Sequence, residues 1–157
     1  MKKVIALSSG LADPKMVLDF NIDVAASYAI SKAALNFAIT KFSAEYAKDG
    51  VLFMSISPGL VDTGHFNNCM CTSLPFLHGL ISRHSRGGRS NGLKVTPAQA
   101  ESIGKLGTSF QKYAPDFKGA RTPEDSVKDM LKVIEGASLE NGDGGAFVSH
   151  KGNQQWL

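Results

Sequence analysis

The chain has 157 residues, of which 43% are hydrophobic and 20% charged, so it suits one globular domain with a core and not a disordered or fibrous protein. Its net charge is +3, and no acidic residue occurs between Asp62 and Glu101. That interval holds four basic residues, Arg83, Arg86, Arg89 and Lys94. Since they gather in one Gly- and Ser-rich stretch and do not line a face, we do not expect nucleic acid as a partner.

The sequence also gives no indication of a membrane or of secretion. No apolar run approaches the roughly 18 residues that span a bilayer, and the apolar run 4–7 is too short for the core of a signal peptide. Cys69 and Cys71 are too few and too close together for a disulfide framework, which agrees with a reducing compartment. We therefore expect a cytoplasmic protein without a membrane partner.

The first predicted element is a buried strand over residues 4–7, which ends at Ser8-Ser9-Gly10. Ligands of parallel α/β sheets bind beyond the carboxyl ends of the strands, so these serines are candidate site residues. A single glycine without G-x-G-x-x-G spacing does not make a dinucleotide phosphate loop. Residues 11–26 are predicted as an irregular connection, with Asp13-Pro14 as a turn.

A long helix is predicted over residues 28–48, with Ser27 as its N-cap and Asp49-Gly50 as its end. Its apolar residues cover more than one face. They form a stripe of Ile30, Ala34, Phe37, Ala38 and Phe42, which Ala33, Leu35, Ile39 and Tyr46 widen. Two interpretations remain open: the second face meets a partner helix, or the helix lies deep in the core.

Tyr28 and Lys32 lie four residues apart at the start of this helix, so their side chains share one face about one turn apart. An ammonium group close to a phenol stabilises the phenolate form, which suits a tyrosine for proton transfer near neutral pH. The same spacing also arises often by chance. The flanking sequence has to decide between the two.

The second predicted strand covers residues 51–56 and is followed by Ser57-Pro58-Gly59-Leu60-Val61-Asp62-Thr63. Proline ends the strand rigidly, and glycine allows the backbone to approach a ligand closely. With this segment, three motifs stand in order: Val4-Ile5-Ala6-Leu7-Ser8-Ser9, Tyr28-Ala29-Ile30-Ser31-Lys32-Ala33-Ala34 and the Pro-Gly segment. Together they resemble the catalytic half of the short-chain dehydrogenase/reductase family.

The resemblance implies a role for each matched residue. Tyr28 would be the general acid/base, Lys32 would hold the nicotinamide ribose and make Tyr28 more acidic, and Ser9 rather than Ser8 would hydrogen-bond the substrate oxygen. The cofactor NAD or NADP would be contacted by Tyr28 and Lys32 and by the segment after the second strand, through Pro58, Gly59, Val61 and Thr63.

The first half of the family's fold has no counterpart in this sequence, including its glycine-rich loop and the residue that selects NAD or NADP. We expect an NAD(P)-dependent oxidoreductase that reduces a small carbonyl or oxidises an alcohol. The alternative is a non-redox protein of the same fold, either a binding or regulatory pseudoenzyme or a cofactor-independent catalyst that uses Tyr28 and Ser9.

Residues 64–95 are predicted as an atypical loop or insertion within a single domain of residues 1–157. The family's substrate loop belongs here, and an insertion over about residues 68–94 is the competing interpretation. A metal site is a third, from His65, Cys69, Cys71 and His78. Their spacing matches no recognised zinc motif, so we predict no metal.

Two capping patterns start the remaining helices, Thr96-Pro97-Ala98-Gln99 and Thr122-Pro123-Glu124-Asp125, and the second helix is predicted to end near Gly136. The residues predicted to face inward are Ile103, Leu106 and Phe110 in the first helix, and Val127, Met130, Leu131 and Ile134 in the second. A short strand over residues 146–148 follows. His150 is predicted to be a surface histidine, and Trp156 to pack on the domain or on a partner.

These elements predict an α/β domain, a partial Rossmann-like fold with about three parallel strands and flanking helices. By the resemblance, the strands 4–7, 51–56 and 146–148 are neighbours in that order, which leaves the first at an edge. Unpaired N–H and C=O groups on an edge strand pair readily with a second chain. We therefore expect a homodimer or a complex with a complete relative.

Overall fold

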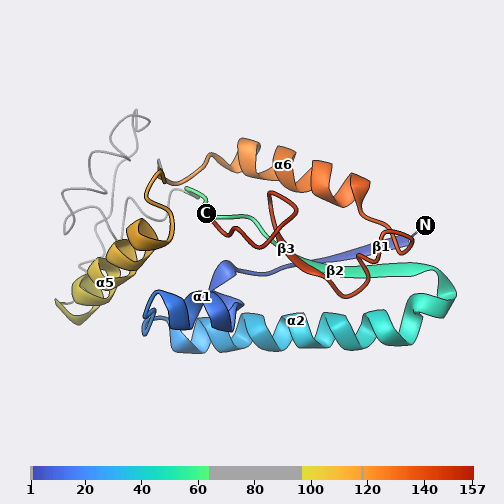
Figure 1. The fold of residues 1–157 in the computed structure, drawn as a ribbon, viewed down its shortest axis with the longest axis horizontal. Helices are drawn as coiled ribbons and strands as arrows, with labels where there is room; N and C mark the ends of the chain where they lie inside the picture. The colour runs from blue at the N-terminus through green and yellow to red at the C-terminus, as the bar shows by residue number, and fades with distance from the viewer. Residues whose placement is uncertain (1, 64–96, 118) are drawn as a thin grey trace.

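The structure is a computed structural model that describes residues 2–63, 97–117 and 119–157 (Figure 1). In these residues β1 (Lys2–Leu7), β2 (Val51–Ser57) and β3 (Phe147–Ser149) form a parallel sheet in the order β1-β2-β3. Val4 lies opposite Phe53, and Ser55 lies opposite Phe147. The predicted α/β fold and strand order are confirmed, although the strand bounds differ by one or two residues from those predicted.

Two helices cover opposite faces of the sheet, as Figure 1 shows: α2 (Ala26–Tyr46) runs along one face and α6 (Pro123–Gly136) along the other. A 3₁₀ turn, η2 (Ala47–Asp49), follows α2, and Gly50 ends it with φ of +68°. The predicted N-cap of α2 is wrong. Ser27 lies inside the first turn, and the cap position is Ala25, in the left-handed region and without a side-chain hydrogen bond.

The side of α2 that meets the sheet is narrow. Ile39 and Ser43 are buried, whereas Ile30 and Phe37 are 68% and 69% exposed. The helix is therefore not deep in a core, because the sheet covers only one of its apolar faces. What lies against the other face stays a prediction.

The connection between β1 and α2 is more regular than predicted. It contains the 3₁₀ turn η1 (Gly10–Ala12) and a short helix, α1 (Pro14–Asp19). Asp13 and Pro14 start that helix instead of making a turn: the Asp13 carboxylate accepts a hydrogen bond from the Lys15 N–H at 2.9 Å, and proline occupies the first helical position.

The buried apolar residues form two clusters. One joins α1 to the end of the chain through Met16, Ile22 and Trp156, so the prediction that Trp156 packs on the domain is confirmed. The other joins β2 to the end of α6 through Leu52, Met54 and Ala137.

Helix α5 (Pro97–Tyr113) packs against the first cluster through Leu106 and Phe110, as predicted. In α6 the predicted cap is present, because the Thr122 hydroxyl accepts a hydrogen bond from the Asp125 N–H at 3.1 Å. The inward stripe of α6 is corrected, since Val127 and Leu131 are exposed. The buried positions are Ser126 and Met130 within the helix and Ala137 directly after it.

No helix among the described residues is both long enough and apolar enough to cross a lipid bilayer. The predictions for residues 64–95, including both cysteines, His65 and His78, lie outside them, as do Thr96 and the side chain of Ile103.

Candidate active site at the carboxyl edge of the sheet

Because the strands are parallel, the residues that follow β1, β2 and β3 meet at one side of the sheet, here called the carboxyl edge. It contains most of the residues that the sequence singles out. Two regions can be distinguished along it, one beside β1 and one beside β3.

Beside β1, Tyr28 and Lys32 lie on the first turns of α2. The Lys32 ammonium donates a hydrogen bond to the carbonyl of Leu7, the last residue of β1, at 2.9 Å. The same nitrogen lies 5.8 Å from the centroid of the Tyr28 ring, and Tyr28 is 47% exposed. Lys32 therefore ties the start of α2 to the end of β1 and keeps a positive charge near an accessible phenol.

The two serines after β1 have different surroundings. Ser8 is buried; its backbone N–H donates to the Ile56 carbonyl at 2.8 Å, and its hydroxyl has no partner in the described residues. Ser9 is half-buried, and its hydroxyl accepts from the Leu11 N–H at 3.3 Å, which caps η1. This bond leaves the Ser9 hydroxyl proton and a lone pair for another group.

The backbone after Ser9 is fixed from two sides. The Gly10 N–H donates to the hydroxyl of Ser57 on β2, in a buried hydrogen bond of 3.1 Å. Trp156 covers Gly10 so closely that a Cβ built there would lie 2.5 Å from the Trp156 Cβ. A glycine is therefore required at position 10 for steric reasons, and the C-terminal segment helps to place Ser9.

The segment after β2 is anchored by contacts with distant residues. Gly59 has φ of +79°, a value that favours glycine. The Ser126 hydroxyl donates to the Pro58 carbonyl at 2.9 Å, and Val61 pairs with Arg121 in a parallel bridge. This bridge includes hydrogen bonds from Arg121 N–H to the Leu60 carbonyl and from Asp62 N–H to the Arg121 carbonyl, both 2.8 Å.

Beside β3, His150 corrects a prediction. It is not a surface histidine, because it is only 3% exposed and its ring lies against Gly59, where a Cβ would meet its Cε1 atom at 2.9 Å. Burial, together with the positive charges of Arg121 and Lys151, lowers the pKa of His150 to about 4. The ring is therefore neutral at pH 7.

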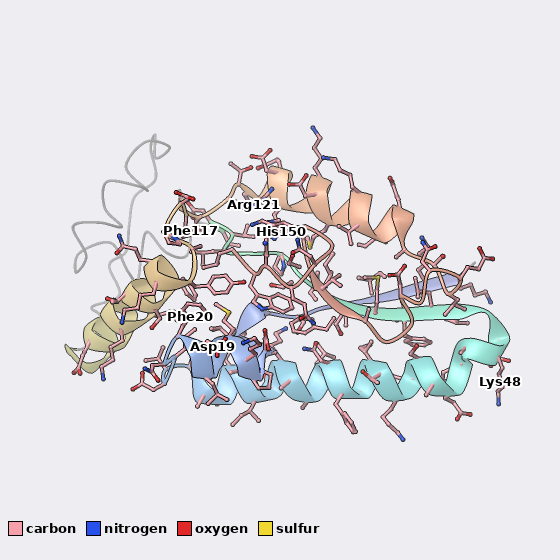
Figure 2. The ribbon with its side chains drawn as sticks, in the orientation of Figure 1. Asp19, Phe20, Lys48, Phe117, Arg121 and His150 are labelled. Carbon is pink, nitrogen blue, oxygen red and sulfur yellow. The ribbon has the colours of Figure 1, made fainter. Side chains whose placement is uncertain are left out.

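Arg121 is the charged neighbour of His150, and Figure 2 labels both below the start of α6. The Arg121 guanidinium pairs with the Asp129 carboxylate, which also accepts from Lys132 at 3.0 Å. The hydrogen bond from Lys132 and then that from Arg121 lower the pKa of Asp129. Asp129 thus remains ionised and holds Arg121 beside the carboxyl edge.

The structure thus places Ser9, Tyr28 and Lys32 by one strand end and Pro58, Gly59 and Val61 by the next, while Thr63 is exposed at the limit of the described segment. Sequence reasoning missed Ser126, Arg121 and the burial of His150. The position of His150 directly after a strand was a usable signal, because that is where ligands of parallel sheets lie. No cluster of three metal-ligating side chains occurs among the described residues.

Three relatives of this chain are short-chain dehydrogenases or dehydrogenases/reductases. No protein-family model matches the chain. A short chain dehydrogenase of Hypocrea virens is 50% identical over the whole chain, and a short-chain dehydrogenase/reductase of Pestalotiopsis fici is 40% identical over 99% of it. A third, from Aspergillus aculeatus, is 42% identical over 99% of the chain. The chain spans 48% of the length of each of the three.

A solved structure with a similar fold is the NADPH-bound carbonyl reductase from chicken fatty liver. The alignment covers 96% of this chain and 41% of that one, with a TM-score of 0.56 and 22% sequence identity. At this identity the similarity concerns the fold alone. It agrees with a partial Rossmann-like arrangement of three parallel strands and flanking helices.

Proposed function

Because this chain belongs to the short-chain dehydrogenase/reductase family, we propose that it takes part in hydride transfer between NAD or NADP and a small carbonyl compound or alcohol. One observation supports this most directly: Lys32 is bonded to the end of β1 and lies beside the exposed Tyr28. A pair that arose by chance has no reason to be fixed at the edge where ligands of parallel sheets bind.

In this proposal Tyr28 exchanges the proton with the substrate oxygen. Its exposure leaves room for a substrate, and the Lys32 ammonium lies 5.8 Å from the centroid of its ring. Ser9 orients the substrate through the part of its hydroxyl that the η1 cap does not use.

The residues present fit a nicotinamide nucleotide. The bond from Lys32 to Leu7 uses one of three ammonium N–H groups, so the others can reach ribose hydroxyls. By the family resemblance the segment of Pro58, Gly59, Val61 and Thr63 would lie along the nicotinamide, and contacts with Ser126 and Arg121 fix its backbone. When bound, the cofactor supplies or accepts the hydride.

The free edge of β1 suggests how the chain associates. In the described residues β1 pairs with β2 alone, and its Val4 and Leu7 are exposed. We propose that this edge pairs with a second copy or with a complete relative. Light scattering at micromolar concentration should then give a mass above that of one chain. A stable monomer that also does not bind a full-length relative would contradict the proposal.

The test of the redox proposal is titration with NADH and NADPH, read by cofactor fluorescence, followed by cofactor oxidation in the presence of aromatic aldehydes and ketones. Saturable binding that weakens in Lys32→Ala but not in Lys41→Ala would support the assignment, because Lys41 is an exposed lysine of the same helix. Absence of binding at millimolar cofactor would leave the non-redox alternative: a binding or regulatory pseudoenzyme, or a cofactor-independent catalyst.

A further inference from the structure

Trp156 contacts the turn after β1 at two points. Its side chain covers Gly10, and its indole N–H donates a hydrogen bond to the Asp13 carboxylate at 2.8 Å. Gly10 is the first residue of η1, and Asp13 is the residue directly after this turn. Trp156 therefore holds η1 at both ends, and Ser9 is the residue that caps the turn.

The two oxygens of the Asp13 carboxylate have separate partners. Oδ1 accepts from the Lys15 N–H at 2.9 Å and so caps α1, whereas Oδ2 accepts from the indole of Trp156. A helix cap needs only one acceptor oxygen, which a serine supplies as well as an aspartate. The second oxygen is what the bond to Trp156 requires, and a bond from an N–H group to a carboxylate is roughly twice as strong as one between neutral groups.

Trp156 is itself held by residues outside the turn. It is buried, its ring stacks on Phe147 of β3 with 4.4 Å between the centroids, and its backbone N–H donates to the Tyr113 hydroxyl at 2.8 Å. Met16 and Ile22 complete the cluster around it. Through this ring, the position of η1 depends on β3 and on the end of α5.

The orientation of the Ser9 hydroxyl depends on the same turn. The hydroxyl accepts from the Leu11 N–H at 3.3 Å, and the Gly10 N–H next to it donates to the Ser57 hydroxyl at 3.1 Å. Both bonds require that η1 keeps its 3₁₀ conformation, because this conformation sets where the two N–H groups lie. A shift of η1 would break both bonds and free the rotation of the Ser9 hydroxyl.

We propose that Trp156 and Asp13 are positioning residues for Ser9: their hydrogen bond fixes η1 and, with it, the direction in which the Ser9 hydroxyl meets the substrate oxygen. Both act through Ser9 and not on the reacting atoms. The part that concerns the substrate rests on the proposed function, whereas the fixing of η1 does not.

Two variants remove this bond from opposite sides. Trp156→Phe keeps a ring over Gly10 and loses the indole N–H, and Asp13→Ser keeps an acceptor for the Lys15 N–H and loses the second oxygen. Tyr113→Phe is the matched control, because it removes a hydrogen bond of Trp156 that does not involve η1. Trp156 is the sole tryptophan of the chain, so its fluorescence shows whether the ring stays buried in Asp13→Ser and Tyr113→Phe.

Hydrogen exchange of the backbone amides, followed by NMR on the whole chain, measures the turn without any need for turnover. In Trp156→Phe and in Asp13→Ser the N–H groups of Gly10 and Leu11 should exchange about tenfold faster, as expected for the loss of one charge-assisted hydrogen bond. The double variant should exchange no faster than either single variant, because both remove the same bond. The amides of β2 should keep their rates, and Tyr113→Phe should raise the exchange of Gly10 and Leu11 by less than about twofold.

Turnover with NAD(P)H tests the link from the turn to the substrate. Trp156→Phe should lower kcat by about three- to tenfold, because a less well oriented substrate reacts more slowly, and should leave the KM for the cofactor unchanged. In a Ser9→Ala background the same substitution should have no further effect. A general loosening of the fold would instead lower kcat in both backgrounds.

Several results would overturn the proposal. One is unchanged exchange at Gly10 and Leu11 in both variants, and another is an equal increase in Tyr113→Phe. A loss of kcat in Trp156→Phe that persists after Ser9→Ala would show that Trp156 does not act through Ser9. Absence of turnover in every protein, together with faster exchange in Trp156→Phe and Asp13→Ser, would refute the proposed function and still support the fixing of the Ser9 turn by Trp156.

Discussion

The two regions of the carboxyl edge are built in opposite ways. Beside β1, the site residues are close in sequence, accessible and held by few bonds: Lys32 reaches Leu7 across 25 positions, and Tyr28 is half exposed. Beside β3, the segment around Gly59 is held by contacts with residues far away in the sequence. Ser126 bonds to Pro58 across 68 positions, and the buried His150 ring fills the space above Gly59.

This difference separates chemistry from positioning. Under the proposed function, groups that exchange protons with a substrate need access, and the β1 region provides it. A backbone segment proposed to contact a cofactor needs a fixed conformation, which the β3 region provides through packing and hydrogen bonds. Substitutions in the first region should therefore change rate with little effect on stability, and substitutions in the second should do the reverse.

The largest expected effect belongs to the β1 region. Tyr28→Phe should reduce any NAD(P)-dependent turnover by about 10²–10⁴-fold, the usual contribution of a general acid/base, while the melting temperature stays nearly unchanged. Tyr46→Phe is the matched control, because Tyr46 is on the same helix and is 42% exposed against 47% for Tyr28. Equal loss of turnover in both variants, or none in Tyr28→Phe, would contradict the assignment.

In the β3 region, Gly59→Ala should be the most destabilising single change. The left-handed φ of +79° costs about 1 kcal/mol for alanine. The new Cβ would also meet His150 at 2.9 Å, which adds about 1–3 kcal/mol. The measurement is the free energy of unfolding by urea.

Gly142→Ala is the control for Gly59→Ala. Its φ is +80°, and a Cβ there meets nothing within 4 Å, so only the backbone term of about 1 kcal/mol should appear. In a His150→Ala background the cost of Gly59→Ala should fall toward that of the control. A cost that is the same in both backgrounds would show that His150 does not hold the loop.

Gly10 links the two regions, and the substitution Gly10→Ala should have the next largest effect. Its Cβ would overlap Trp156 at 2.5 Å, and displacing this side chain should cost about 1–3 kcal/mol. Because Gly10 follows Ser9, the variant should also lose turnover. Gly136→Ala, where a Cβ meets nothing within 4 Å, should do neither. A stable and active Gly10→Ala would mean that the C-terminal segment is not needed to place Ser9.

The contrast between the regions also explains what the sequence could predict. The Tyr28–Lys32 spacing is a local pattern, whereas the strand order was predicted from the family resemblance, and both agree with the structure. The burial of His150 depends on Gly59 and Arg121, which no local pattern connects to it. Only the position of His150 directly after a strand could have suggested that it belongs to the site.

Other errors have equally physical causes. Asp13-Pro14 favours a turn and the start of a helix about equally, and α1 has only six residues, too few to show a helical period. In α2 apolar residues occur all round the helix, so their pattern could not show that Ile30 and Phe37 lie outside the sheet contact. Local propensity predicts where helices and strands lie along the sequence, whereas the burial of a residue depends on which other elements pack against it.

The smallest expected effect concerns the pH dependence of stability. His150 has a pKa of about 4 in the folded chain and an ordinary value of 6.5 when unfolded. Between these values the unfolded chain binds a proton that the folded chain does not, so lowering the pH from 6.5 toward 4 destabilises the fold, and above 6.5 the effect vanishes. Urea unfolding at pH 7.0, 5.5 and 4.5 measures it, on the order of 1 kcal/mol per pH unit between the two pKa values. His150→Phe and His150→Gln should both lose stability less steeply than the unsubstituted chain as the pH falls, which separates the charge of the ring from its shape.

Other titrating groups, including Asp129, cancel in the difference between variants. Parallel curves for all three proteins would mean that the ring takes up its proton in the folded chain as readily as in the unfolded one, and that the β3 region is more open to water than its packing against Gly59 requires.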